Sequence, residues 1–539
     1  MEMSEILALS GALLLVGVLS SKLSSKVNLP ILLVFLAVGM IAGNDGLEWV
    51  RLSGRTNGAH VNFFGTVAMC FILFSGGMNT RFSAVRKVLP TGILLASVGV
   101  VLTALILGLS AFNICLLFGH PLPLLWCLLL GALISSTDAA AVFAILRGRS
   151  VSLKGKYLQP LLEFESGSND PTAYLLTILM VDMLKSGNDV SPLYLLLRIA
   201  VGVLWGIGAG ALFGFGFGIV AQGIYILCGR RKLIEYEGLY FVLGIAIVLL
   251  SYGISEHYFR ANGMMAAYVC GITMGNIRFY FHKGITQFND GVGWLMQVGL
   301  FTVLGLLVSP RELLNPYACL LPGLLLSAVL IFVARPLAVW LSMTGSPFST
   351  REKLFISWVG LRGAAPIMLA TFPLAAGVEE AGTLFNMIFF MVLTSMLVQG
   401  PTLMPLARLL GLAAPFAEHP RIPLELEVTS GSRNQEMFEF EVAGDAPFAG
   451  TALAALGLPA GVLVLLIRRD DEFLQPHGNT VIRSGDGLLI MGDHRAMEEV
   501  HRSFFPAVEY QPVRSYEEIR RSVPLLKRLH LLSKRITAK

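Results

Sequence analysis

Long apolar stretches follow one another along the chain up to about residue 412. They predict thirteen helices, at residues 4–22, 28–44, 61–78, 90–113, 122–147, 157–184, 192–227, 235–256, 261–277, 286–308, 315–345, 351–377 and 383–411. Such lengths suit a hydrocarbon core of about 30 Å. Inside a bilayer each backbone N–H and C=O must find its partner within the protein, and a helix pairs them within itself. The sequence therefore predicts an all-α polytopic membrane domain.

The composition changes after Leu412. The whole chain is 55% hydrophobic and 14% charged, whereas soluble domains have about 25% charged residues, and the charges are concentrated beyond this point. Alternating residues in 437–443 and the run 485–493 predict strands, and residues 496–505 predict an amphipathic helix. We therefore expect a transmembrane domain at 1–412, a small cytoplasmic α+β domain at 413–506 and a basic tail at 507–539.

Lys and Arg are distributed unevenly between the two sets of loops. The loops after odd-numbered helices contain sixteen of them, and those after even-numbered helices contain five. By the positive-inside rule, the N-terminus is predicted to be periplasmic and the C-terminal domain cytoplasmic. The first segment has no basic region and no small-residue cleavage site, so we interpret it as a retained helix. The net charge of +5 forms no cationic groove or arm, so we expect no nucleic-acid partner.

The predicted helix at 157–184 carries a polar face in its middle. Glu163, Glu165, Asn169 and Asp170 lie within eight residues of one another, and each charge at mid-bilayer costs at least about 2.5 kcal/mol on insertion scales. Glu165 and Asn169 are four residues apart and share a helix face, and Asp170 lies near Ser166. Ionisable residues inside a membrane indicate an ion or proton pathway.

Pro171 follows this polar face directly. Because proline has no N–H to donate, the helix backbone near Gly167 is predicted to loosen. Carbonyl oxygens released beside a carboxylate are the oxygen ligands that a hard monovalent cation needs. The segment therefore predicts a cation site, and a purely structural role for these residues is the alternative.

A second polar interruption occurs in the predicted helix at 122–147. Ser135, Ser136, Thr137 and Asp138 are consecutive and lie mid-span. A run of this kind predicts a broken helix whose ends face a site near the bilayer midplane. Alternatively, the hydroxyl groups cap a kink and Asp138 pairs with loose backbone amides.

A third interruption occurs in the predicted helix at 351–377, where Arg362 stands between Gly360 and Gly363. An arginine inside the membrane needs an anionic partner. We expect Arg362 to form an ion pair with Glu165 or Glu163 that holds two helices in register, and a direct transport role is the alternative. Arg335 is placed nearer a membrane end, where its side chain can snorkel to water.

The three interruptions together resemble the monovalent cation:proton antiporter superfamily, in its NhaP-like branch. The resemblance rests on GALISSTDAAAVFAIL, ESGSNDP and GLRGAAPI, and it extends over residues 5–410. It implies an NhaA-like fold with inverted repeats, two broken crossing helices and a homodimer. Ala139 departs from the usual pattern, in which proline is common at that position.

The same resemblance implies roles for individual residues. Asp170 would hold a monovalent cation or a proton in turn. The residues around it would be Asn169, Ser166, Thr137 and Asp138, and the structural ion pair would join Glu165 to Arg362. Because Asn169 replaces a second acid, electroneutral one-for-one exchange by alternating access is expected.

The C-terminal domain resembles the C-terminal lobe of the regulator-of-K⁺-conductance family. The resemblance rests on residues 447–493 and implies a regulatory lobe that binds a small-molecule ligand or dimerises. The companion nucleotide-binding lobe and its GxGxxG are missing from the sequence, so we expect no cofactor. An antiporter with this lobe resembles bacterial potassium/proton antiporters of the inner membrane. Residue chemistry at the site does not separate K⁺ from Na⁺, so a Na⁺/H⁺ antiporter is the alternative.

Two other classes of protein are the alternatives to a transporter. A ligand-gated cation channel should have a pore filter and short pore helices, and an intramembrane enzyme should have a nucleophile–base pair or a metal site. The sequence has neither pattern, and His257 and His282 lie near helix ends. We therefore expect a transporter rather than an enzyme. The glycine ladder from Gly202 to Gly218, with a glycine every four residues, predicts close helix packing, either within one protomer or between subunits.

Overall fold

The computed structural model divides into two units, Met1–Phe416 and Ala417–Lys539, which we describe separately. The structure describes residues 31–138, 151–186, 192–415 and 435–504, except for 44, 51–53, 120–121, 156, 232, 278, 280, 443–445, 447 and 470–471; it also describes 142 and some positions between 8 and 19. Most of the first predicted helix, most of residues 139–150 and the basic tail at 507–539 lie outside the described residues.

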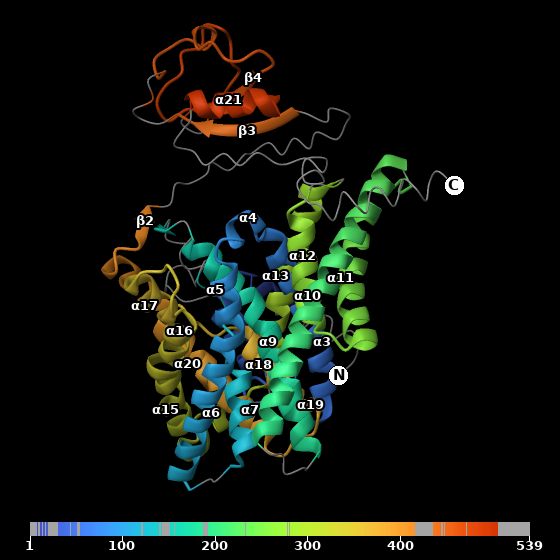
Figure 1. Cartoon of the computed structure of the whole chain (residues 1–539), viewed down its shortest axis with the longest axis vertical. Helices are drawn as coiled ribbons and strands as arrows, with labels where there is room; N and C mark the ends of the chain where they lie inside the picture. Colours follow the sequence, from blue (N-terminus) through green and yellow to red (C-terminus); the bar gives the residue numbers. More distant parts are fainter. Residues whose placement is uncertain are drawn as a thin grey trace. The chain divides into compact units, whose positions relative to one another are not determined.

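The first unit is built mainly from helices that run side by side (Figure 1). Its helices are α2 (Ile31–Ala42), α3 (Gly54–Asn79), α4 (Phe82–Val85), α5 (Leu89–Leu94), α6 (Val100–Leu117), α7 (Leu124–Leu133), α9 (Leu158–Ser186), α10 (Pro192–Arg231), α11 (Gly238–Phe259), α12 (Gly263–Gly275), α13 (His282–Leu307), α14 (Pro310–Leu313), α15 (Leu321–Val329), α16 (Arg335–Ser342), α17 (Thr350–Trp358), α18 (Ala364–Leu369), α19 (Thr371–Ala375) and α20 (Ala381–Leu409). Short π-helical segments, η1 (Leu95–Gly99), η2 (Pro316–Leu320) and η3 (Leu330–Ala334), continue the neighbouring helices.

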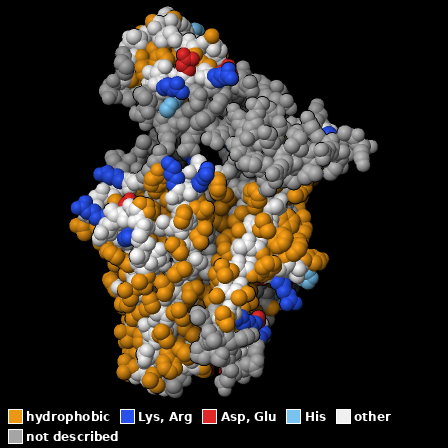
Figure 2. All heavy atoms as spheres, in the orientation of Figure 1, with side chains coloured by type: hydrophobic (Ala, Val, Ile, Leu, Met, Phe, Trp, Pro, Cys, Tyr) orange, Lys and Arg blue, Asp and Glu red, His pale blue; other side chains and the backbone are white. Residues whose placement is uncertain are grey.

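Within the described residues, seven helical stretches are long and apolar enough to cross a membrane. Hydrophobic side chains cover most of the visible face of this unit, as expected for a surface against lipid (Figure 2). α9 is 29 residues long but is not among the seven, because its polar residues lower its mean hydropathy. The prediction of a helical membrane domain is confirmed, and the count of thirteen helices stays a prediction.

Glycines allow several of these helices to approach each other closely. A side chain at Gly210 would lie 2.6 Å from the carbonyl oxygen of Asn262, and one at Gly214 would overlap the backbone of Ala266. The glycine ladder of α10 therefore packs within the protomer, against α12 and, through Gly202 and Gly206, against α9; this is the first of the two interpretations offered by the sequence. All six cysteines are free and buried.

A two-stranded antiparallel sheet joins two distant parts of this unit. β1 (Val151–Leu153) precedes α9 and pairs with β2 (Ala413–Pro415), which follows α20. The N–H of Lys154 extends the pairing by donating to the carbonyl oxygen of Leu412 at 2.7 Å. The segment that leads into α9 is therefore hydrogen-bonded to the segment that leaves the last helix.

The second unit contains a four-stranded antiparallel sheet and one helix. The strands β3 (Gln435–Glu441), β4 (Leu463–Arg469), β5 (Glu472–Leu474) and β6 (Gly487–Asp493) are arranged in the order β3-β6-β4-β5. A short 3₁₀ helix, η4 (Leu453–Ala455), precedes β4, and α21 (His494–Phe504) packs Met497 and Val500 into the core of the sheet. The α+β class predicted for this region is confirmed.

Candidate functional site

Two helices of the first unit are interrupted, and the interruptions contact each other. α7 ends at Leu133 and the chain is not helical from there to Asp138, while α17 ends at Trp358 and α18 begins only at Ala364. The N–H of Asp138 donates to the carbonyl oxygen of Leu361 at 2.8 Å. Both interruptions predicted from the sequence are present, and they meet through their backbones.

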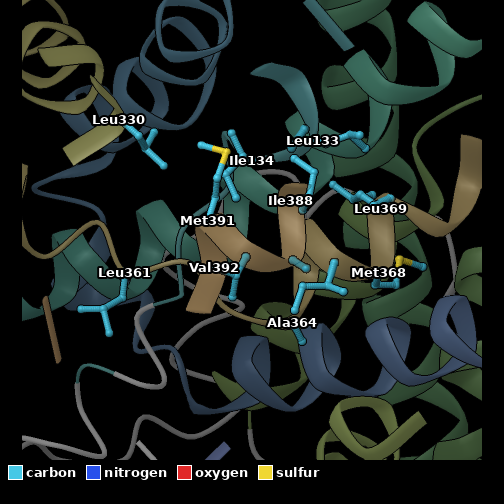
Figure 3. Close-up of a cluster of buried hydrophobic side chains, with 14 of the residues drawn as sticks. Leu133, Ile134, Leu330, Leu361, Ala364, Met368, Leu369, Ile388, Met391 and Val392 are labelled. Carbon is cyan, nitrogen blue, oxygen red and sulfur yellow. The ribbon is translucent and has the colours of Figure 1, made fainter. Parts of the chain in front are cut away.

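Apolar side chains surround this meeting point. Figure 3 shows Leu133 and Ile134 from the end of α7 near Ile388 and Met391 of α20, with Leu361 from the second interruption close by. All five residues are completely buried. The unpaired polar backbone of the two interruptions therefore lies in an apolar surrounding, where its groups must find partners within the protein.

Arg362 supplies part of that pairing. Its side chain is only 1% exposed, and its Nη1 donates to the carbonyl oxygens of Ser135 and Ser136, each at 2.6 Å. Its own N–H donates to the hydroxyl oxygen of Ser395 at 3.2 Å. Backbone carbonyls beyond a helix end carry partial negative charge and have no helical partner. The Arg362 guanidinium therefore compensates for the unwinding after α7.

The predicted ion pair between Glu165 and Arg362 is wrong. Glu165 pairs instead with Arg335, whose Nη2 lies 2.6 Å from the Glu165 carboxylate. Arg335 is 4% exposed and does not snorkel to a membrane surface. Arg362 stays within electrostatic reach of Glu165, but Arg335 makes the close contact from the start of α16, where it faces Gly360 and the lack of a side chain leaves room for it. The ion pair joins α9 to α16.

Thr137 connects the first interruption to α9. The side-chain amide of Asn169 donates to the Thr137 hydroxyl at 2.6 Å, and the Ser166 hydroxyl donates to the Thr137 carbonyl oxygen at 2.9 Å. Asn169 is completely buried. The structure thus brings together three residues that the sequence singled out on two separate helices.

Asp138 is packed against the second interruption. A side chain at Gly363 would overlap the Asp138 carboxylate, so only glycine fits at this point. Asp138 is also within electrostatic reach of Asp170 on α9. Both interrupted segments therefore contribute to the surroundings of Asp170.

Three buried oxygen atoms at this junction form no hydrogen bond of regular geometry with the described residues, although the Ser136 side chain lies close enough to interact with the Asp170 carboxylate. They are Oδ1 of Asp170, Oδ1 of Asn169 and Oγ of Ser136, and all three are buried. Buried polar atoms in proteins are almost always hydrogen-bonded, so unpaired ones require an explanation. A desolvated monovalent cation, which binds oxygen atoms only, would satisfy them. The donor set therefore fits a cation.

α9 continues through this region without a break. The loosening predicted near Gly167 does not interrupt the helix, which runs from Leu158 to Ser186 with Pro171 inside it. Pro171 removes the single backbone hydrogen bond to the carbonyl of Gly167, and the Tyr268 ring packs closely against Gly167.

Some polar residues of this region were missed or left without a role. Glu163 accepts a hydrogen bond from Gln159 one turn earlier, at 2.9 Å. Asn262, at the start of α12, donates to the carbonyl oxygen of Pro171 at 2.6 Å. The sequence signal for Asn262 was available, because asparagine before a helical stretch is a favoured N-cap.

The sequence matches known families in both units. Residues 11–409 match the family described as sodium/hydrogen exchanger, transmembrane, and residues 437–504 match the TrkA-C domain. The chain is 38% identical to the K(+)/H(+) antiporter NhaP of Alkalimonas amylolytica, over 89% of this chain and 80% of that protein. It is also 38% identical to the K(+)/H(+) antiporter NhaP2 of Shewanella oneidensis, over 94% of this chain and 84% of that protein.

A solved structure has a similar fold. It is the sodium proton antiporter MjNhaP1 from Methanocaldococcus jannaschii at pH 8, with a TM-score of 0.61 and 24% identity. The match covers 74% of this chain and all of that one. The first unit therefore has the fold of a membrane antiporter.

Proposed function

The chain belongs to the sodium/hydrogen exchanger family, and on that premise we propose that it is a secondary active antiporter, which exchanges K⁺ for H⁺ across a bacterial inner membrane. The observation that carries the proposal is the group of buried side-chain oxygen atoms on Asp170, Asn169 and Ser136, of which Asn169 Oδ1 has no hydrogen-bond partner among the described residues. They lie where two interrupted helices meet, and irregular backbone at membrane depth is typical of substrate sites in transporters.

Competition at Asp170 couples the two ions. A carboxylate that has bound a proton has no negative charge to offer a cation, and a carboxylate that holds a cation does not take up a proton readily. Asn169, Ser166 and Thr137 hold the surroundings in place, and Asp138 adds negative charge from the other side. Because Asn169 is neutral, one cation is exchanged for one proton in each cycle, and the exchange is electroneutral.

Alternating access moves the site between the two faces of the membrane. In this proposal a bundle that contains α7, α9 and α17 to α19 moves against a scaffold of other helices, and the scaffold forms the dimer contact. The thirteen spans, the inverted repeats, the periplasmic N-terminus and the cytoplasmic second unit belong to the same proposal. It is supported by the likeness in fold to the antiporter MjNhaP1 and by the excess of Lys and Arg in one set of loops.

The second unit acts as a regulatory lobe in this proposal. Its TrkA-C match supports a small-molecule ligand or dimerisation as the signal. K⁺ is favoured because the two relatives that share 38% identity are named K⁺/H⁺ antiporters. Na⁺ is the second candidate, because the similar solved structure is of a sodium proton antiporter.

The test is a titration of proton flux with single cations. K⁺, Na⁺, Li⁺ and Rb⁺ are each added to everted vesicles that hold a pH gradient, for the full chain and for a chain ending at Phe416. We expect K⁺ to dissipate the gradient at the lowest concentration, and the shortened chain to exchange ions without ligand control. A half-saturating concentration that is lower for Na⁺ than for K⁺ would favour the second candidate. No response of the pH gradient to any of the four cations would contradict the proposal.

A further inference from the structure

A second group of polar side chains, partly buried, lies one helical turn beyond Asp170. Tyr174 follows Asp170 by four residues on α9, so the two share a helix face. Tyr174 is 3% exposed, and its hydroxyl donates to Oε1 of Glu256 on α11 at 3.1 Å. The hydroxyl of Tyr252, also on α11, lies 3.4 Å from that of Tyr174. The exchange step described above uses none of these three residues.

Glu256 is anchored at the corner between α11 and α12. Its other oxygen, Oε2, accepts a hydrogen bond from the N–H of Gly263 at 2.8 Å. Both carboxylate oxygens are therefore engaged by donors, which makes Glu256 an anchor for Tyr174 rather than a free cation ligand. The first backbone donor of α12 adds the partial positive charge of a helix N-terminus to this anchor.

Asn262 ties the same corner to its neighbours. It caps α12 by accepting from the N–H of Met265 at 3.0 Å, and its own N–H donates to the carbonyl oxygen of Gly206 on α10 at 3.2 Å. Its side-chain amide donates to the carbonyl oxygen of Pro171, the residue after Asp170. Two hydrogen bonds, from Tyr174 and to Pro171, thus join the turn of α9 beyond Asp170 to a corner that is fixed to α10.

The ring of Tyr174 also contacts the second interrupted helix. It meets Phe372 of α19 edge to face, with ring centroids 5.3 Å apart. Tyr174 therefore stands between the helices that form the ion site, α9 and α19, and the group formed by α10, α11 and α12.

We propose that Tyr174 and Glu256 form a latch between the ion-site helices and the α11–α12 corner, which closes in one access state and opens in the other. The proposal rests on the exchange function proposed above, because exchange requires α9 to move relative to α10–α12. A hydrogen bond across that boundary can form in only one of the two states. It therefore sets the balance between them, and Tyr174 and Glu256 act as positioning residues for Asp170.

Tyr174→Phe tests the latch, because it removes the hydroxyl and keeps the ring. A bond made in one state only shifts the population of the two states when it is lost. We expect the half-saturating cation concentration to change by about fivefold, rising at one membrane face and falling at the other. The measurement compares cation-driven proton flux in everted vesicles and in right-side-out vesicles.

Tyr225→Phe is the matched control. Tyr225 on α10 is also completely buried, and its hydroxyl donates to the carbonyl oxygen of Tyr240 at 2.9 Å, away from the boundary. The Tyr225→Phe variant should leave unchanged the ratio of the half-saturating cation concentrations at the two membrane faces. The latch would be overturned if Tyr174→Phe changed the half-saturating cation concentration equally at both faces, or if its ratio of the two concentrations matched that of the control variant.

Glu256→Gln separates the bond from the charge. Glutamine keeps a side-chain oxygen that can accept from Tyr174, so the ratio should stay closer to that of the wild type than with Tyr174→Phe. Adding Tyr174→Phe to Glu256→Gln should produce no more than the Tyr174→Phe shift, since both changes act on one contact. Additive shifts would overturn the latch. A wild-type protein without cation-driven flux would instead contradict the proposed function.

Discussion

The two buried arginines of the first unit neutralise different partners. Arg335 lies against the Glu165 carboxylate, and Arg362 donates to backbone carbonyls of the unwound segment after α7. The Glu165 carboxylate therefore has Arg335 as its close ionic partner, and Arg362 stabilises the unwound backbone beside the proposed exchange site. Of the carboxylates on α9 that the sequence singled out, Asp170 is the one with a buried oxygen at the junction of the interruptions that forms no hydrogen bond of regular geometry with the described residues.

Loss of Arg335 should destabilise the protein strongly. Arg335→Met leaves the Glu165 carboxylate buried without its cation, and breaking a buried pair in this way costs about 3–5 kcal/mol. Thermal unfolding in detergent measures the loss. The double variant Arg335→Met, Glu165→Gln removes both charges and should regain at least half of the stability. If it is as unstable as the single variant, the ion pair is not the source of the effect.

In the second unit, Asp486 accepts two hydrogen bonds from the Arg469 side chain, at 2.8 and 2.7 Å, and one from the N–H of Arg483 at 2.7 Å. Burial raises the pKa of this carboxyl, but the hydrogen bonds outweigh it and hold the pKa below its ordinary value of 3.8. Because the folded pKa is depressed, the contribution to stability is complete above the ordinary value and is lost as the pH falls through the folded pKa.

Asp486→Asn should therefore weaken the lobe at neutral pH, and its effect should shrink as the pH falls below 3.8 through the depressed pKa of Asp486. We expect the free energy of unfolding of the lobe to fall by about 1–2 kcal/mol at pH 7. The loss stays small because the Arg469 side chain is 19% exposed, so water screens its charge. Resistance of the lobe to proteinase K at neutral pH and to pepsin in acid checks this in the full chain. An equal difference from the wild type at both pH values would contradict the pKa argument.

At the scale of elements, contact between α10 and α12 depends on glycine. Gly214 lies against the backbone of Ala266, whereas Gly216 on the same helix has no atom within 4 Å of the position a side chain would take. The two glycines differ in surroundings and share a helix. Alanine substitution at Gly214 tests the effect of close packing, and the same substitution at Gly216 tests the intrinsic helix preference of alanine over glycine.

Gly214→Ala should lower the thermal unfolding midpoint, because the added methyl group forces α10 and α12 apart at a cost of about 1–3 kcal/mol. Gly216→Ala should leave the midpoint unchanged or raise it, since alanine favours a helix by up to about 1 kcal/mol over glycine. Unfolding followed in detergent for both variants measures the difference. Equal midpoints for the two variants would show that the ladder does not determine this contact.

The helices could be predicted from the sequence better than their irregularities. Apolar length and turn residues place most of the helices within a few residues of their observed ends. The interruption at 359–363 was visible because Arg362 stands between two glycines. The continuity of α9 across Pro171 was not, because packing by Tyr268 decides it. The π-helical segments η1, η2 and η3 are as apolar as the α-helices around them, so the hydropathy of the sequence does not reveal them.

At the scale of the whole molecule, pairings across the bundle were the hardest to foresee. Motif residues on α7 and α9 are joined as the resemblance implied, through Thr137 and Asn169. The partner of Glu165 was misjudged because two arginines were available, and only the three-dimensional path of η3 into α16 places Arg335 beside α9. Hydropathy defines which segments are helices but does not define which of them touch.

In the mechanism proposed above, one carboxylate, that of Asp170, exchanges a cation for a proton. Asp170→Asn removes the exchangeable charge and keeps the size of the side chain. Asp182→Asn, at an exposed position on the same helix, is the matched control. Both proteins should be present in the membrane at wild-type levels.

The decisive measurement is K⁺-driven proton flux in everted vesicles that contain these two variants, with a probe of membrane potential in parallel. We predict that Asp170→Asn abolishes the flux, that Asp182→Asn retains it, and that neither the wild type nor Asp182→Asn generates a membrane potential. Near-normal flux in Asp170→Asn would contradict the assignment of the exchange site to Asp170.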